Sequence, residues 1–232
     1  MGEGVQVGKT SQGGVIDETV ILEHFLCTIL FFSLHNNTNR LSADDVVTNA
    51  INSLNAISRL RRPAFGSIFL LNNISYLRRH LLQPSHPDLL PLISQPTIDT
   101  INSNWRTAKA AYFDTNFTQL MQAITDDPKE KTGKSQAKEK FTRFFDLLEE
   151  VVERHRMAEV LGDDKEARDA VADEIVMLVI PSLNRFTQKQ KEKEFSRSEF
   201  LILFFTLLPE LAFIISFNFS DPQKCELACS WS

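Results

Sequence analysis

Apolar residues recur every three or four positions through most of residues 43–187, which is the spacing of one face of an α-helix. The alternating apolar and polar pattern of a half-buried strand is rare. Ser42 and Asp45 form an S-x-x-D sequence typical of a capping box, so we predict a helix that begins after Ser42. Pro63 suits the first turn of a second helix. The apolar stripes of these two helices are Val47, Ala50, Ile51, Leu54 and Ile57, and then Ile68, Leu71, Ile74, Leu77 and Leu81.

A proline-rich connector at residues 83–96 separates the second helix from a third. Thr97 or Asp99 can cap this third helix, because a short polar side chain at the N-cap accepts hydrogen bonds from the first backbone N–H groups. The apolar stripe of the third helix follows helical spacing. Its residues are Ile101, Trp105, Ala108, Tyr112, Phe117, Leu120 and Ile124.

A charged loop at residues 125–140 leads into a fourth helix, which Gly162 can end. A last helix is expected from about Asp164, and Pro181 should kink or divide it. The predicted fold class is therefore all-α, an antiparallel array of amphipathic helices without an internal repeat of fixed period. The inward residues of the last two helices are Phe141, Phe144, Phe145, Leu148, Val151 and Val152, and then Ala167, Val171, Ile175, Leu178, Leu183 and Phe186.

Two strongly apolar segments lie outside this array. Residues 20–34 are short for a membrane span, so we expect a buried helix there. Residues 200–219 carry Glu210 as their sole charge and are long enough to span a bilayer. Such a span, with lysines and arginines on its cytoplasmic flank, would make a tail-anchored membrane protein. The abrupt change in composition favours the other explanation, a retained intron or a shifted reading frame, and residues 15–40 can share that origin.

Composition narrows the class of protein. A hydrophobic content of 43% with 24% charged residues is ordinary for a globular protein and argues against wholesale disorder. A net charge of −5 argues against a general nucleic-acid-binding protein, since such proteins carry a basic excess. Cys27, Cys225 and Cys229 are odd in number and lack the spacing of a metal site, which indicates thiols in a reducing compartment.

The sequence contains no recognisable catalytic constellation. Gly-Lys-Thr at residues 8–10 lacks the earlier glycine and the preceding apolar strand that a phosphate-binding loop requires. The five histidines form no H-E-x-x-H pattern, and no serine lies in a G-x-S-x-G setting. We therefore predict a protein that is not an enzyme and that holds no cofactor and no metal ion.

Positive charge gathers at residues 59–62, 129–143 and 185–197. Such clusters can contact acidic lipid or an acidic partner surface. The favoured alternative is that they are solvated helix ends, where cations interact favourably with the helix dipole. Both interpretations stay open. The first cluster contains Arg59, Arg61 and Arg62, and the candidate contact residues of the other two are Lys129, Lys131, Lys134, Lys138, Arg185, Lys189, Lys191 and Lys193.

Two adjacent asparagines interrupt the apolar run of the predicted second helix. At about 100° per residue, Asn73 faces away from the stripe that contains Leu71, whereas Asn72 flanks it. We predict that Asn72 hydrogen-bonds a neighbouring helix or loop and fixes the register in which the helices stack, as buried polar residues can. Neither asparagine is expected to act as a catalytic amide.

Three long segments carry a resemblance to a known family. They are PAFGSIFLLNNISYLRRHLL (63–82), NSNWRTAKAAYFDTNFTQLMQAITDDPKEKTGKSQAKEKFTRFFDLLEEVVERHRMAEVL (102–161) and VIPSLNRFTQKQKEKEFS (179–196). Together they resemble the seventy-kilodalton subunit of the exocyst complex, especially its fungal members, over about residues 44–196. Residues 69–76 match the FLxNNxxY helix that is the hallmark of that family.

The resemblance implies a truncated part of an elongated rod of stacked helical bundles. It implies a non-catalytic role in tethering secretory vesicles to the plasma membrane. The implied partners are other exocyst subunits, a Rho-type GTPase and phosphoinositide-containing membrane, with no nucleic acid. The implied location is cytoplasmic and peripheral, at sites of polarised secretion such as the bud tip or bud neck. The family's phosphoinositide contacts lie beyond the matching part, so no residue of this chain inherits them.

The resemblance also divides the chain into three parts. We expect an atypical N-terminal segment at residues 1–40, with a flexible start followed by an apolar helix. A helical exocyst-subunit-like region is expected at residues 41–196, and an atypical apolar tail at residues 197–232.

Overall fold

The computed structural model describes residues 42–82, 90–125 and 134–191. Within these ranges the regular structure is helical and no strand occurs, which confirms the predicted all-α class. A short 3₁₀ helix, η1 (Leu90–Leu92), precedes the third of the long helices. The long helices are α2 (Ala43–Arg59), α3 (Pro63–Leu82), α4 (Gln95–Ala123), α5 (Lys134–Ala158) and α6 (Lys165–Lys191).

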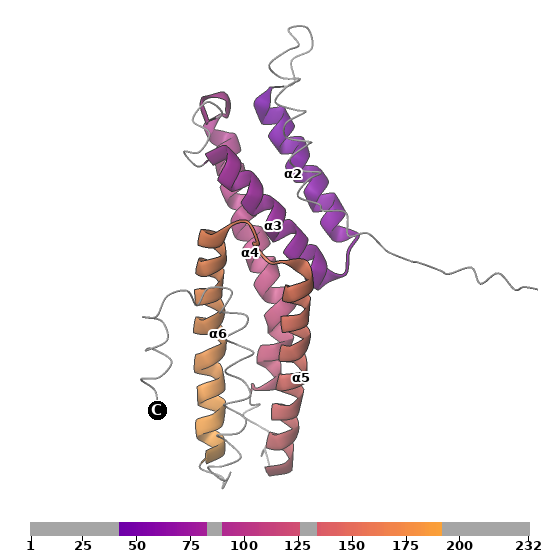
Figure 1. Ribbon diagram of the computed structural model, residues 1–232, viewed down its shortest axis with the longest axis vertical. Coiled ribbons are helices and arrows are strands. Elements are labelled where there is room, and N and C mark those ends of the chain that lie inside the picture. Colours follow the sequence, from indigo (N-terminus) through magenta and orange to yellow (C-terminus); the bar gives the residue numbers. More distant parts are fainter. Residues whose placement is uncertain (1–41, 83–89, 126–133, 192–232) are drawn as a thin grey trace, which may run out of the picture.

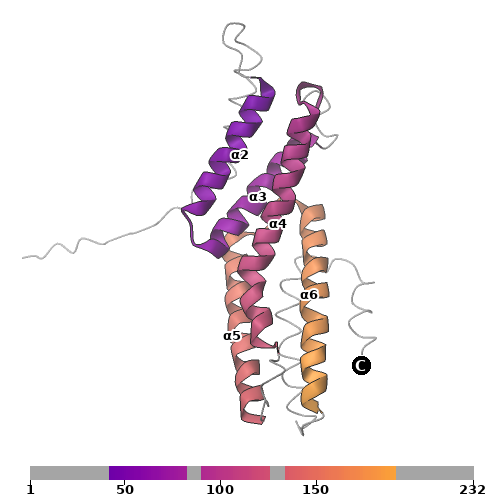
Figure 2. The ribbon, with the colours of Figure 1, turned by 180° about the vertical axis from the view of Figure 1, so that it is seen from behind.

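The helices alternate in direction and form an elongated molecule (Figure 1). The first half of α4 packs with α2 and α3, and its second half lies beside α5 and α6 (Figures 1 and 2). Two clusters of buried side chains follow this division, one among α2, α3 and the start of α4, and the other among α3, α4, α5 and α6. Trp105 of α4 packs against both clusters, so the two bundles are stacked along a shared helix. The predicted stacking of helical bundles is confirmed.

Like α4, α3 contributes to both bundles. Its neighbouring residues Ile68 and Phe69 are both buried, but they belong to different clusters. The approach of α3 to α2 depends on Gly66, where a Cβ atom would lie 2.3 Å from the backbone oxygen of Ser58. Glycine in a helix usually lowers stability relative to alanine, by about 0.5–1 kcal/mol. Here the missing side chain permits the backbones of α2 and α3 to approach each other.

The predicted starts of the first two helices are confirmed. The Oγ of Ser42 accepts a hydrogen bond from the backbone N–H of Asp45 at 3.2 Å. The carboxylate of Asp45 accepts the backbone N–H of Ser42 at 3.2 Å, which completes the capping box. α3 begins at Pro63, a position where the missing proline N–H would have no helical partner.

The start of α4 differs from the prediction. Ser94 is the N-cap, so neither Thr97 nor Asp99 is. Pro96 lies in the first turn, where a proline costs the helix no hydrogen bond. Asp44 of α2 accepts the backbone N–H of Ser94 at 2.9 Å, and this hydrogen bond lowers the pKa of the Asp44 carboxyl. The neighbouring helix thus helps to fix where α4 begins.

The end of α5 also differs from the prediction. The helix ends at Ala158, before Gly162. The left-handed backbone conformation that glycine favours is adopted instead by Glu159 and Leu161, with φ angles of 43° and 54°. Tertiary hydrogen bonds hold these two residues, as described below.

The predicted division of the last helix at Pro181 is wrong, because α6 continues through this residue. Val179 and Leu183, on either side of the proline, are buried in the same cluster, so packing keeps the two halves of α6 aligned. Most residues of the predicted stripes are buried. Leu178 is an exception at 38% exposure, since it lies about 100° around the helix from Val179. Ile57 is another, at 42% exposure near the end of α2.

Several predictions concern residues outside the described ranges. These are the apolar helix at residues 20–34, the apolar tail at residues 200–219 and the expected boundaries near residues 40 and 197. Among the helices of the described ranges, none has the length and apolar character needed to cross a membrane.

Candidate functional site

Asn72 of α3 holds the turn between α5 and α6, residues 159–164 (the α5–α6 turn). Its Oδ1 accepts the backbone N–H of Leu161 at 2.8 Å. Its Nδ2 donates to the backbone oxygens of Ala158 at 3.3 Å and Glu159 at 3.5 Å. Asn72 therefore hydrogen-bonds a neighbouring turn, as predicted, with both ends of its amide.

Two further residues of α3 contact the same turn. Ser75 donates its hydroxyl to the carboxylate of Asp164 at 2.5 Å. Arg79 donates to the backbone oxygen of Asp163. Asn72, Ser75 and Arg79 are spaced three and four residues apart, so they project from one face of α3. We call these three residues the α3 clamp. The sequence pattern pointed to Asn72 alone, although the helical spacing of Ser75 and Arg79 was a usable signal.

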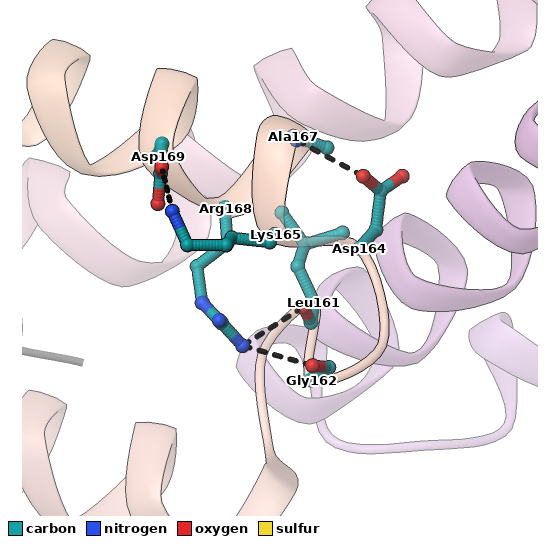
Figure 3. A network of polar contacts seen from close by, with 7 residues as sticks. All are labelled: Leu161, Gly162, Asp164, Lys165, Ala167, Arg168 and Asp169. Carbon is teal, nitrogen blue, oxygen red and sulfur yellow. Dashed lines mark hydrogen bonds and ion pairs between the residues drawn. The ribbon is translucent and has the colours of Figure 1, made fainter. Parts of the chain in front are cut away.

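The first turn of α6 also holds the α5–α6 turn (Figure 3). Arg168 donates from Nη1 to the backbone oxygen of Gly162 at 2.8 Å. Asp164 accepts the backbone N–H of Ala167 at 3.0 Å, which caps the start of α6. The left-handed residues of the turn are thus fixed by groups from α3 and α6.

Asn73 is placed differently from the prediction. It is 7% exposed, and its Nδ2 donates to the backbone oxygen of Phe69 at 2.7 Å. Asn73 was predicted to face away from the stripe of Leu71, but it is not exposed there, because the side of α3 opposite Leu71 is also covered. Phe69, one helical turn before Asn73, packs there into the cluster shared with α2.

Tyr112 of α4 and His155 of α5 form a polar pair between their helices, in which Tyr112 is buried and His155 is half-buried. The Oη of Tyr112 lies 2.5 Å from the Nε2 of His155. The Nδ1 of His155 lies 2.6 Å from the backbone oxygen of Val151. A carbonyl only accepts, so Nδ1 carries the proton and Nε2 accepts from the tyrosine hydroxyl.

Both members of this pair are neutral at physiological pH. The pKa of His155 is lowered to about 4, chiefly by desolvation of the imidazole and also by the charge of Arg154, while the hydrogen bond to Val151 acts in the opposite direction. Burial raises the pKa of Tyr112 above its ordinary value. Nothing in the sequence pattern pairs these two residues, since they lie on separate helices.

A second polar network joins α3, α4 and α5 beside this pair. Arg154 donates to the Oδ1 of Asn116 at 3.0 Å. The Nδ2 of Asn116 donates to the hydroxyl of Ser67 at 3.1 Å, and that hydroxyl is 2.7 Å from the hydroxyl of Thr115. Satisfied networks of this kind specify one packing of the helices, because any other arrangement leaves buried polar groups unpaired.

The candidate basic residues are brought together only in part. The rings of Phe141 and Phe186 lie 4.9 Å apart, so the start of α5 is beside the end of α6. Lys138, Arg185 and Lys189 are exposed near this end of the molecule, which we call the basic end. Lys134 begins α5 and Lys191 ends α6 at the same end. The remaining candidates, Lys129, Lys131 and Lys193, lie outside the described residues.

The cluster at residues 59–62 is elsewhere, at the end of α2 and in the turn that leads to α3. Arg59, Arg61 and Arg62 are all exposed there, and the guanidinium of Arg61 lies 4.3 Å from the ring centre of Phe69. Across residues 42–82, 90–125 and 134–191, no group of three or more His, Cys, Asp or Glu residues could hold a metal ion.

Comparison with models of protein families shows which family the chain belongs to. The family model that matches describes the C-terminal region of Exo70, which is a component of the exocyst complex. It matches residues 38–202, which is more than two-thirds of the 232-residue chain. The chain belongs to this family. The Exo70 match includes every helix from α2 to α6. No curated protein matches the chain, and no solved structure does so.

Membership in the Exo70 family gives this chain a coarse functional assignment. The family consists of non-catalytic subunits of the exocyst that act in vesicle tethering together with the other exocyst subunits. Their place of action is the cytoplasm and the plasma membrane. The predicted resemblance is confirmed, and the α3 clamp overlaps the hallmark segment at residues 69–76.

Proposed function

We propose that this chain acts as a rigid, non-catalytic segment of an exocyst subunit whose basic end contacts acidic groups at the plasma membrane during vesicle tethering. The observation that carries the proposal is the meeting of two basic clusters, far apart in the sequence, at one end of the rod. Lys138 and Arg185 are exposed there on neighbouring helices. Several cations on one face attract anionic lipid more strongly than the same cations dispersed.

Phosphoinositide headgroups are the proposed ligand of the basic end. The cations lie at the ends of α5 and α6 and not along the side of a helix. We therefore expect this end of the rod to meet the membrane surface. Each lysine or arginine near an anionic surface contributes about 1 kcal/mol, so a handful of residues suffices for weak, reversible attachment. Partner subunits and a Rho-type GTPase would then bind the sides of the rod, and localisation at the bud tip or bud neck would follow from the complex.

Vesicle sedimentation tests the lipid contact. The double variant Lys138→Glu/Arg185→Glu should bind phosphoinositide-containing vesicles at least about thirtyfold less than the unmodified chain, because two contributions of about 1 kcal/mol are lost. Arg106→Glu, at an exposed position in the middle of α4, is the matched control and should bind nearly as well. Equal binding by all three proteins would reject the basic end as the lipid contact.

Assembly with partners tests the tethering role itself. The tagged chain, mixed with the purified remaining exocyst subunits, should co-purify with at least one of them, and a Rho-type GTPase in its GTP state should be tested in parallel. Failure to bind any subunit, by a chain shown to be folded, would contradict the tethering role. A fluorescent copy in a budding cell should gather at the bud tip or bud neck, and an even cytoplasmic distribution would contradict that localisation.

A further inference from the structure

An open depression of about 660 Å³ lies on the outer side of α5, beside the first turn of α3. Its apolar part consists of Phe65, Val152 and Met157. Val152 is buried beneath it, Phe65 is half-buried, and Met157 is 66% exposed. The volume falls within the range of about 300–1,000 Å³ that is usual for binding pockets.

Acidic side chains surround this apolar part. The carboxylates are those of Asp146, Glu149, Glu150 and Glu153, and all four residues are exposed. Two arginines also line the depression, but each has an acidic neighbour: Arg156 lies 2.7 Å from Glu153, and Arg154 lies 4.0 Å from Glu150. The lining therefore keeps a net negative charge.

Asp146 and Glu149 supply that charge. Neither carboxylate forms an ion pair or a side-chain hydrogen bond with another of the described residues. Their carboxylates are thus available to cations from outside the chain. The guanidinium of Arg154 also approaches the ring of Phe65, at 6.0 Å from its centre, which fixes the wall of the depression on the α3 side.

The shape of the depression fits one face of a helix. Its acidic rim extends along α5 from Asp146 to Glu153 and its apolar end reaches Met157, which is about three helical turns or roughly 16 Å. A partner helix laid along α5 would place successive side chains over the same length. Helices with an apolar stripe commonly bind in grooves of this kind.

We propose that this depression, which we call the α5 groove, binds a basic amphipathic helix of another exocyst subunit. Lysines or arginines of that helix would meet Asp146 and Glu149, and a large apolar side chain would pack against Phe65 and Met157. Charge complementarity of this kind selects a basic partner and speeds the encounter. The identity of the partner as an exocyst subunit rests on the proposed function.

Met177 provides an internal comparison for the α5 groove. It is 76% exposed on α6, and the exposed carboxylates of Asp173 and Glu174 precede it. The surroundings of Met157 and Met177 therefore share an exposed methionine and acidic neighbours, but of the two only Met157 lines the depression. The chain has four methionines, at positions 1, 121, 157 and 177, so their methyl signals are easily assigned.

The test is methyl NMR of the full chain labelled at its methionines. The first probe is a synthetic helical peptide with leucines on one face and lysines on the other, and the same peptide with glutamates in place of lysines is its control. We expect the lysine peptide to shift the Met157 signal while leaving Met177 unchanged, and the glutamate peptide to shift neither. Equal shifts at Met157 and Met177, or no shift at either, would overturn the proposal.

Variants connect the signal to the acidic rim. Asp146→Lys/Glu149→Lys should weaken binding of the lysine peptide about tenfold. The control Glu166→Lys/Asp173→Lys, at exposed positions of α6, should leave it unchanged. Circular dichroism of both variants shows whether the helices are intact. If Asp146→Lys/Glu149→Lys, the rim variant, is folded and still binds the lysine peptide as well as the unmodified chain does, the proposal is overturned.

The second probe is the set of purified exocyst subunits. If they bind the chain and broaden the Met157 signal, and the rim variant weakens that binding, the proposal is supported. If they bind without affecting Met157 or depending on the rim, the proposal fails while the tethering role stands. If no subunit binds although the lysine peptide does, the tethering role fails, and the exocyst partner assigned to the α5 groove is rejected with it.

Discussion

Leu161 donates its backbone N–H to the amide oxygen of Asn72 over 2.8 Å, although 89 residues separate the two in the chain. Leu161 is 2% exposed and adopts a left-handed backbone conformation. Such a conformation is uncommon for a bulky residue and persists where its surroundings fix it. The contact therefore couples the turn of the second bundle to α3, which contributes to both bundles.

Replacing Asn72 with leucine should destabilise the protein by about 1–3 kcal/mol, because the buried N–H of Leu161 would lose its acceptor. Denaturant unfolding followed by circular dichroism measures this change. Asn52→Leu, at an exposed position of α2, is the matched control and should change stability little. An Asn72→Leu protein as stable as the control would remove the register role that we assign to Asn72.

Gly66→Ala should destabilise the protein by about 1–3 kcal/mol, because its Cβ would lie 2.3 Å from the backbone oxygen of Ser58 and would force α2 away from α3. Gly162→Ala is the contrasting change. The nearest atom to a Cβ there is 3.4 Å away, the residue is exposed, and its φ is not left-handed. Its effect should stay within about 0.5 kcal/mol. Equal thermal midpoints for the two variants would contradict the close approach of α2 and α3.

Acid should destabilise the protein through His155. Its pKa is about 4 in the folded chain and near 6.5 when unfolded, so the unfolded state takes up the proton first. Stability from this group is complete above pH 6.5 and declines as the pH falls toward 4. The loss amounts to about 3 kcal/mol at most.

Carboxylates also titrate in part of the range between pH 6.5 and 4. A variant without His155 is therefore needed to separate the contribution of His155 from theirs. His155→Gln should lower stability at neutral pH, since it disturbs the bond to Tyr112. It should also flatten the dependence of unfolding free energy on pH between 6.5 and 5. The same slope in both proteins would show that His155 does not have the lowered pKa.

Asp164 should matter more to stability than its partner Ser75, because it accepts the serine hydroxyl and also caps α6 at Ala167. Asp164→Ala should therefore cost about 1–3 kcal/mol, and Ser75→Ala about 1 kcal/mol. Asp164→Ser can keep the cap and should recover part of the loss. Urea unfolding of the three variants gives the order, and a larger effect for Ser75→Ala would show that the cap contributes little.

The local sequence was sufficient for the helices and their apolar stripes. The capping box at Ser42, the helix that starts at Pro63 and the stripe from Ile101 to Leu120 depend on residues within a few turns of one another. Periodicity and capping are properties of short segments, so they can be read without the fold. The family relationship likewise followed from collinear segments, and it was confirmed over residues 38–202.

Only the tertiary structure decided which polar groups meet and which helix faces are buried. The sequence indicated that Asn72 needs a partner, but not that the partner is the N–H of Leu161. It placed Asn73 away from the stripe of Leu71, but not against a second buried cluster on that side of α3. The pairing of Tyr112 with His155 had no sequence signal at all. The physical reason is that a helix repeats its own geometry locally, while burial and hydrogen-bond pairing depend on which helices pack together in space.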